Sequence, residues 1–458
     1  MKQEHSKDMT KGSPLKLILS FSLPLLLGNI FQQTYNMVDT AIVGQTLGAK
    51  SLAAVGASTS VQFLVLGFCQ GLCLGFNVPI GQRFGAKDPD GMHRYEYVGS
   101  IMAAVFALVL TVITELLCGP ILHALQVPAE IYDQAYQYLF VIFLEIPFAI
   151  LYNWLGGMMR AIGDSRTPFI FLAIASVTNI FLDLLFILTF HWGVAGAAIA
   201  TVLSQALSGV LCLMAIRSQF PILSIPKKDR HFIKRDAAVL INMGIPMGLQ
   251  WSIVAIGSMI MQSANNSLGT LYVSAFTAGA KIKQFVLCPF DALATAVSMF
   301  VSQNYGARKI ERMRKGIRQG TIIGMIYGLL AGVIMIFLGR TLCLLFLSRS
   351  QVAALDAAAL YLRRMGYLFW VLSPLNVLRM SMQGMSFANR AMFAGVMEMA
   401  ARTFVSLVFV SFFGFDAITW TDQSAWISGV LYALPMCLHS LKQVELRFEQ
   451  ERAGAESR

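Results

Sequence analysis

Long apolar stretches separated by short polar segments form the main pattern along the chain. Twelve of these stretches are long enough for a membrane-spanning helix, which needs about 20 apolar residues. We therefore expect an all-α polytopic membrane protein with twelve transmembrane helices. The predicted spans cover approximately residues 15–43, 52–80, 96–118, 136–158, 168–190, 193–216, 237–265, 273–304, 317–339, 360–384, 391–413 and 424–441.

The composition supports a membrane protein. Of the 458 residues, 56% are hydrophobic and only 13% are charged, and the mean hydropathy is +0.64. Soluble domains are about 25% charged, so this chain could not cover a water-exposed surface. The seven cysteines lie within or at the ends of apolar stretches, which indicates packing rather than a disulfide framework. No cleavage site follows the polar N-terminus, so we expect no removable signal peptide.

The net charge of +11 is distributed unevenly between the two sides of the predicted membrane. The N-terminus, the C-terminus and the loops on their side carry 27 lysines and arginines, whereas the opposite side carries seven. Because basic residues accumulate in cytoplasmic loops, we expect both termini in the cytoplasm. This topology explains the charge without nucleic-acid binding.

The two halves of the chain resemble one another. The segment starting at Gln82 (Q-R-F-G-A-K) matches the one starting at Gln303 (Q-N-Y-G-A-R), and the same offset of 221 relates Leu47-Gly48 to Leu268-Gly269. Both halves would begin on the same side of the membrane, which is a parallel repeat typical of transporters. We expect an N-terminal lobe (1–216), a cytoplasmic linker (217–236), a C-terminal lobe (237–441) and a cytoplasmic tail (442–458), with the two lobes as pseudo-symmetric six-helix bundles.

Two acidic residues in predicted spans suggest ion coupling. Asp39 lies in the first span and Asp183 in the fifth, with Asn179 one turn earlier and Thr201 in the next span. An ionisable group in hydrocarbon is costly, by about 2.5–3.5 kcal/mol on insertion scales, and usually functional. Oxygen ligands of these types suit a proton or a hard monovalent cation such as Na⁺. A purely structural hydrogen-bond network is the alternative.

Other polar or helix-breaking residues in the spans receive different interpretations. Pro24 precedes Asp39 in the same helix and could act as a bending point or as a static kink. Glu398 and Arg402 have the spacing of an ion pair within one helix. Glu145 and Asp291 lie beside prolines and could satisfy freed backbone groups.

The ordered set of motifs resembles the multidrug and toxic compound extrusion (MATE) family, in particular its DinF-like bacterial and archaeal branch. The motifs that carry the resemblance are V-D-T-A-I-V-G from Val38 to Gly44, the loop Q-x-x-G-A from Gln82, R-A-I-G-D-S-R-T-P from Arg160 to Pro168, N-x-x-x-D from Asn179 to Asp183, and G-V-A-G-A-A-I-A-T-V-L-S-Q from Gly193 to Gln205. The resemblance implies two six-helix lobes around a V-shaped cleft. It also implies antiport of amphipathic, often cationic compounds against protons or sodium ions.

The resemblance also implies roles for individual residues. The cation site of the DinF-like branch corresponds to Asp39, Asn179, Asp183 and Thr201, which would hold H⁺ or Na⁺, and Pro24 corresponds to the bending point. Another bacterial branch has an acid in the seventh helix, and this chain has none there. Flexible and aromatic side chains suit a multidrug pocket. Our candidates for substrate contact are Asn36, Met37, Phe63, Tyr138, Asn153, Trp154, Met158, Gln250 and Gln262.

The main hypothesis is therefore a monomeric, cation-coupled exporter of small organic compounds in the plasma membrane of a prokaryote, without a resident cofactor. A flippase for lipid-linked precursors is the alternative, and it predicts a strongly basic central cavity. A receptor or scaffold would need neither the duplication nor the paired acids. An enzyme is not expected, because the spans contain no nucleophile or metal-ligand constellation and no nucleotide-binding loop.

Overall fold

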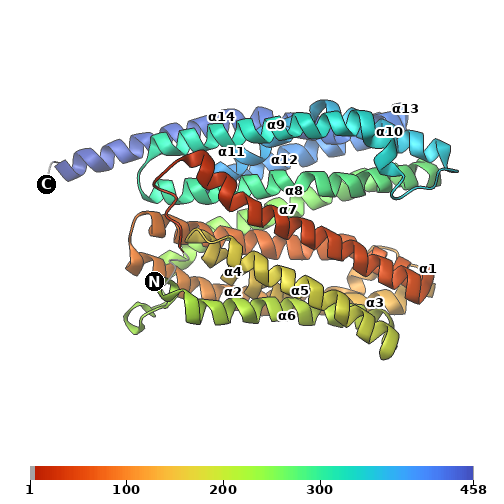
Figure 1. Cartoon of the computed structure of the whole chain (residues 1–458), viewed down its shortest axis with the longest axis horizontal. Helices are drawn as coiled ribbons and strands as arrows, with labels where there is room; N and C mark the ends of the chain where they lie inside the picture. The colour runs from red at the N-terminus through yellow and green to blue at the C-terminus, as the bar shows by residue number, and fades with distance from the viewer. Residues whose placement is uncertain (1–5, 457–458) are drawn as a thin grey trace. The chain divides into compact units, whose positions relative to one another are not determined.

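A computed structural model of the chain describes residues 6–456, without the side chains of Ala49, Ala455 and Glu456. The described residues form helices and connecting loops, with no strand among them (Figure 1). The helices of the first half are α1 (Pro14–Gly85), α2 (Pro89–Ala124), α3 (Ala129–Phe143), α4 (Ile146–Ala161), α5 (Arg166–Leu184) and α6 (Gly193–Gln219). The all-α prediction is confirmed.

The second half begins after two short 3₁₀ turns, η2 (Pro221–Leu223) and η3 (Lys227–Asp229). Its helices are α7 (Lys234–Asn266), α8 (Thr270–Gly306), α9 (Ile310–Cys343), α10 (Val352–Leu368), α11 (Leu372–Gly384), α12 (Ala388–Phe404), α13 (Val410–Phe413) and α14 (Phe415–Glu456). The last helix extends well beyond the predicted span 424–441 at both ends. The predicted tail from residue 442 therefore continues this helix to its end at Glu456.

Eleven helical segments of the described chain are long and apolar enough to cross a membrane. Gly48, at φ +84°, divides α1 into two of them, Pro14–Gly48 and Lys50–Gly85. The predicted span 360–384 is not among the eleven because a 3₁₀ turn, η4 (Phe369–Val371), interrupts it and leaves two shorter helices. With this interrupted span the described residues provide twelve crossings.

The internal repeat extends to the irregularities of the backbone. Gly48 and its counterpart Gly269 (φ +102°) both have positive φ and an extended ψ, a conformation that glycine adopts without a Cβ clash. Lys87 and Arg308, also 221 positions apart, share φ of 56°. A single π turn follows both α5 and α12, at η1 (Leu185–Thr189) and η5 (Val405–Phe409). The internal repeat is therefore present in the backbone conformation as well as in the sequence.

The chain divides into two compact units whose boundaries differ from the predicted lobes. Among the described residues, the first unit contains residues 6–8 and Leu27–Gly248, and the second contains Met9–Leu26 and Leu249 onward. The beginning of α1 thus belongs to the second unit and the beginning of α7 to the first. The beginning of α7 packs closely against the second span of α1 within the first unit. The two backbones approach so closely that a Cβ on Gly75 would lie 2.6 Å from the Cα of Gly244.

Each unit has its own packed interior. In the first, α6 packs against α3, α4 and α5, and α2 packs against α4. In the second, α8 packs against α9, α10 and α11, and α12 packs against α14. All seven cysteines are buried and unpaired, as the sequence indicated.

Candidate functional site

Three helices of the first unit bring the predicted ion-coupling residues together. Asp39 lies on the first span of α1, Asn179 and Asp183 lie on the last two turns of α5, and Thr201 lies on α6. Small residues before Thr201, in the stretch G-V-A-G-A-A-I-A from Gly193, allow α5 and α6 to pack closely. The π turn η1 begins two residues after Asp183, and such turns are frequent at functional sites.

The four side chains form a contiguous group. The carboxyl groups of Asp39 and Asp183 are neighbours, and the Asn179 amide nitrogen lies 3.4 Å from the hydroxyl oxygen of Thr201. That hydroxyl donates to the carbonyl of Ala197 at 3.2 Å. Asp183 is 0% exposed and Asn179 is 1% exposed. Two acids, an amide and a hydroxyl thus converge inside the unit, in the combination that the sequence predicted.

The oxygen atoms of this group lack donors. Oδ1 of Asp39, Oδ1 of Asn179 and both carboxylate oxygens of Asp183 are buried without a hydrogen-bond partner among the described residues. Buried polar atoms are nearly always paired, because an unpaired one costs about 1–3 kcal/mol and a charged one more. Four such acceptors in one place are the arrangement that a bound cation or proton would satisfy.

The surroundings of the group are acidic, aromatic and apolar. Tyr138 lies among Asp39, Asp183 and Glu145, and Tyr35 lies one helical turn before Asp39 near the same acids. Among the described residues, no lysine, arginine or histidine forms an ion pair with any of these three acids. The apolar cluster around the site includes Val43, Ile142, Ile187 and Ala197.

Glu145 has a different place from the one expected. It lies at the break between α3 and α4, makes no side-chain cap bond there, and its Oε2 is buried without a partner among the described residues. The expectation that its carboxylate satisfies backbone groups beside Pro147 is therefore wrong. Tyr35 was not among the predicted site residues, although its spacing of four residues from Asp39 places both on one helix face.

The second unit contains a contrasting buried acid. Asp422 on α14 accepts bonds from Lys283 at 2.7 Å, Tyr361 at 2.9 Å and Arg402 at 3.2 Å. Arg379 pairs with Glu398 at 2.7 Å. The predicted Glu398–Arg402 pair within one helix is thus replaced by pairs between helices. Asp422 was not predicted as a buried acid, because the predicted span began at residue 424, two positions after it.

The candidate substrate residues are distributed between surface and core. Trp154 and Met158 are 2% and 3% exposed in the core of the first unit, and Trp154 donates to Ser100 at 3.1 Å. Gln250 is buried and accepts from Gln383 at 2.8 Å. Phe63 and Asn36 are exposed, and Met37 and Gln262 are partly buried. Tyr138 is nearly buried at the acidic group, and Asn153 bonds its own helix at Ala149.

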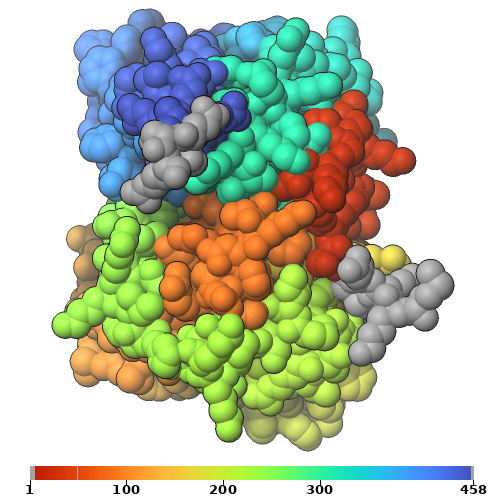
Figure 2. All heavy atoms as spheres, turned by 90° about the vertical axis from the view of Figure 1, so that its left-hand side faces the viewer, coloured from red at the N-terminus to blue at the C-terminus, as the bar shows by residue number. Residues whose placement is uncertain are grey.

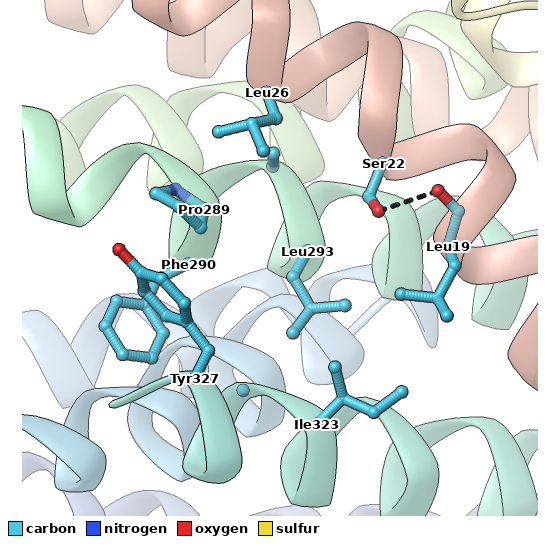
Figure 3. Close-up of a pocket in the computed structure, with 10 residues that line it drawn as sticks. Leu19, Ser22, Leu26, Pro289, Phe290, Leu293, Ile323 and Tyr327 are labelled. Atoms are coloured by element: carbon cyan, nitrogen blue, oxygen red, sulfur yellow. Dashed lines mark hydrogen bonds between the residues drawn. The ribbon is translucent and has the colours of Figure 1, made fainter. Parts of the chain in front are cut away.

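An apolar cavity of about 180 Å³ lies within the second unit (Figure 3). Leu19, Ser22 and Leu26 from α1 face Phe290, Leu293 and Ile323 from α8 and α9. Its two hydroxyls are already used, since Ser22 donates to Leu19 at 3.0 Å and Tyr327 donates to Val286 at 2.8 Å. Such a cavity suits an apolar group rather than an ion.

Comparison with known proteins agrees with this architecture. The MatE family model matches residues 24–185 and 246–410, so its two matches begin 222 positions apart, in equivalent parts of the two halves. A protein described as probable multidrug resistance protein YpnP, from Bacillus subtilis (strain 168), is 33% identical over 67% of this chain and 68% of its own length. The multidrug export protein MepA of Staphylococcus haemolyticus (strain JCSC1435) is 23% identical over 92% of both chains.

Solved structures show the same fold. A crystal structure of MATE in the bent conformation has a TM-score of 0.88 at 20% identity and covers 99% of this chain and 100% of its own. An outward-facing multidrug resistance MATE family transporter has a TM-score of 0.86 at 21% identity, with coverage of 97% and 98%. From the family match, the duplicated helices and the twelve-crossing fold, we conclude that this chain belongs to the MatE family of membrane transporters.

Proposed function

We propose that the chain is a cation-coupled antiporter that exports amphipathic, often cationic organic compounds. The relatives named above are described as multidrug resistance or export proteins, which supports this class of substrate. The coupling ion would be H⁺ or Na⁺, bound at Asp39, Asn179, Asp183 and Thr201. The main support for this site is that Asp39, Asn179 and Asp183 have buried oxygen atoms that accept no hydrogen bond from the described residues.

The acidic group can couple transport because its charge is not compensated by the protein. An ion that binds there neutralises neighbouring carboxylates in an apolar environment, where charge interactions are strong. Its release leaves the two acids unpaired, and this state is costly. Occupancy would therefore favour one arrangement of α1, α5 and α6, and vacancy another, as alternating access requires.

One ion per cycle supplies enough energy for export. A charge that crosses 100 mV releases ~2.3 kcal/mol. Since ~1.4 kcal/mol corresponds to a tenfold gradient, this would support a substrate gradient of about 50-fold. No energy from nucleotide hydrolysis is needed.

The flippase hypothesis receives less support. A site for the phosphate groups of lipid-linked precursors needs several basic residues. The acidic group of the first unit has no ion-paired base among the described residues, as given above. Exposed Asn36 and half-buried Met37, which lie just before Asp39 in the sequence, instead offer an amide and a thioether, and exposed Phe63 on the next span offers an aromatic face. We propose these three as substrate contacts and leave out the buried Trp154 and Met158.

The Asp39→Asn variant tests the coupling. It keeps the size of the side chain and removes the charge, so we expect normal insertion into the membrane and loss of ion-driven export. Purified protein in liposomes would be given a pH gradient or a sodium gradient separately, and efflux of a fluorescent cation would be followed. The gradient that drives export identifies the ion.

The matched control is Asp133→Asn, which makes the same chemical change at an exposed position on α3. We expect it to export at the parental rate. If Asp39→Asn also exported at that rate under both gradients, the assignment of Asp39 to coupling would be wrong.

A further inference from the structure

The segment between α6 and α7 lies against the beginning of α2. Both of its 3₁₀ turns, η2 and η3, contact α2, and the two regions meet on the face shown in Figure 2, where α2 begins in orange and the segment is yellow-green. All of these residues belong to the first unit. The contact is built around one histidine, His93, which is 9% exposed.

Three possible metal ligands converge at this contact. Asp90 and His93 on α2 and Asp229 on η3 place one ligand atom each within 4.8 Å of the others. His93 Nδ1 and Asp229 Oδ2 are 3.3 Å apart. Asp229 is 7% exposed, so its carboxylate is directed into the contact rather than into solvent.

The hydrogen bond of His93 Nε2 determines whether Nδ1 is a donor or an acceptor in the neutral ring. Nε2 lies 2.9 Å from the carbonyl oxygen of Ile222, which can only accept, so Nε2 carries a hydrogen. In the neutral ring, Nδ1 then presents a lone pair to the carboxylate of Asp229. Two acceptors cannot bond to one another, so either a proton or a metal cation lies between these two atoms.

The geometry points to a divalent metal cation in that position. Metal-ligating histidines typically donate their other N–H to a backbone carbonyl or a carboxylate, as His93 does to Ile222. A tetrahedral ion with bonds of about 2.1 Å holds neighbouring ligand atoms about 3.4 Å apart, close to the observed 3.3 Å. A charge-assisted hydrogen bond would be about 2.7–2.9 Å long.

We propose that Asp90, His93 and Asp229 bind a first-row transition-metal cation of the Zn²⁺ type. An imidazole with two carboxylates suits such an ion, whereas Mg²⁺ and Ca²⁺ prefer oxygen ligands alone. Lys228 donates to Oδ1 of Asp90 at 2.9 Å, and a carboxylate has two oxygens, so Asp90 can hold both Lys228 and a metal ion. A water molecule would complete the coordination on the exposed side of Asp90.

The bound metal would fasten the segment between α6 and α7 to α2. This segment carries Lys227, Lys228 and Arg230, with Lys234 and Arg235 just after it. Trypsin cleaves after lysine and arginine, so the segment contains several potential trypsin sites. Metal binding at Asp229 would hold it against α2 and slow cleavage. The site is separate in sequence and in chemistry from the acidic group of Asp39 and Asp183.

Titration with Co²⁺ tests the proposal. The full chain, without an affinity tag and stripped with a chelator, should bind one Co²⁺ with visible d–d absorption, and Zn²⁺ should abolish the signal by displacement. His93→Ala should remove the absorption, and the isosteric Asp229→Asn should weaken binding by at least the roughly 10–100-fold that loss of an outer-shell partner costs. Either metal should slow tryptic cleavage at residues 227–235 in the parental protein only.

His231→Ala is the matched control, because it removes an exposed histidine from the same segment without touching the three ligands. It should bind Co²⁺ like the parental protein. If the parental protein bound no Co²⁺, or if Asp229→Asn and His93→Ala bound it unchanged, the proposal would be overturned. The contact between His93 and Asp229 would then be an ordinary hydrogen bond.

Discussion

At the scale of single residues, two buried carboxylates of one chain have opposite environments. Asp183 has no donor on either oxygen among the described residues, whereas Asp422 is held by Lys283, Arg402 and Tyr361. A carboxylate surrounded by fixed cations gains nothing from an additional ion. A carboxylate without partners has a standing cost that an ion can remove. This difference, and not burial alone, makes Asp183 the better candidate for ion binding.

The Asp422→Asn variant should be strongly destabilised. The substitution leaves the charges of Lys283 and Arg402 buried without their partner, and breaking a buried pair in this way costs about 3–5 kcal/mol. We expect a clearly lower midpoint of thermal unfolding in detergent. Ion-driven transport, measured at a temperature where the variant is folded, should persist.

Asp356→Asn is the comparison. Asp356 pairs with Arg340, but both side chains are more than half exposed, at 59% and 55%. Removing an exposed pair should cost less than about 1 kcal/mol. Equal melting of the two variants would contradict the structural role assigned to Asp422.

At the scale of helices, two prolines occupy equivalent positions in α1 and α7. Pro24 lies two residues before Leu26, the last residue of α1 in the second unit, and Pro246 lies two residues before Gly248, the last residue of α7 in the first unit. A proline removes one backbone hydrogen bond and weakens the helix at that turn. Each helix is therefore weakest close to the point where it passes between units. Backbone dihedrals inside α1 are non-helical only at Gly48, so α1 is not broken at Pro24.

Pro24→Ala should restore the missing hydrogen bond and stiffen α1. If bending at Pro24 is part of the transport cycle, the variant will keep ion binding, lose most of its transport rate, and melt at the parental temperature or above. Binding can be followed by the ion-dependent shift of the melting midpoint. Pro14→Ala is the control, because Pro14 occupies the first helical position, where proline interrupts no hydrogen bond. Parental transport by Pro24→Ala would make Pro24 a static feature.

At the scale of the whole molecule, each compact unit is assembled from both halves of the sequence. The first 18 residues of the second unit, Met9–Leu26, come from the beginning of the chain. They are held there by Gln303, which accepts from the backbone of Met9 at 2.8 Å, and by Lys309, which donates to Thr10 at 2.9 Å. Truncating this segment would therefore disturb the second unit.

The orientation that the loop charges predict, with both termini in the cytoplasm, is open to a direct test. We expect Ala453→Cys to react with a membrane-impermeant maleimide only after cells are permeabilised, and Ser348→Cys, in the loop between α9 and α10, to react in intact cells. Both positions are exposed, and the native cysteines are buried, so background labelling should be low. The reverse pattern would invert the proposed topology.

Most of the fold could be predicted because a membrane restricts what a chain can do. Backbone groups in hydrocarbon must bond within a helix, so each long apolar stretch implies a crossing. The interrupted span around η4 and the early start of α14 were harder to predict, because both depend on packing against neighbouring helices. The pairing of Glu398 was mispredicted for the same reason, since Arg379 lies on α11, and spacing within one helix cannot reveal a partner on another.

The sequence by itself determined the all-α membrane architecture and the duplication, because these depend on local composition and period. It also predicted that the oxygen-bearing residues at positions 39, 179, 183 and 201 converge, and their role in ion binding stays a prediction. Only the tertiary structure decided which carboxylates have partners, which parts of α1 and α7 belong to which unit, and that His93 meets Asp229. These properties depend on contacts between residues far apart in the chain, and the local sequence pattern does not show which distant residues come into contact.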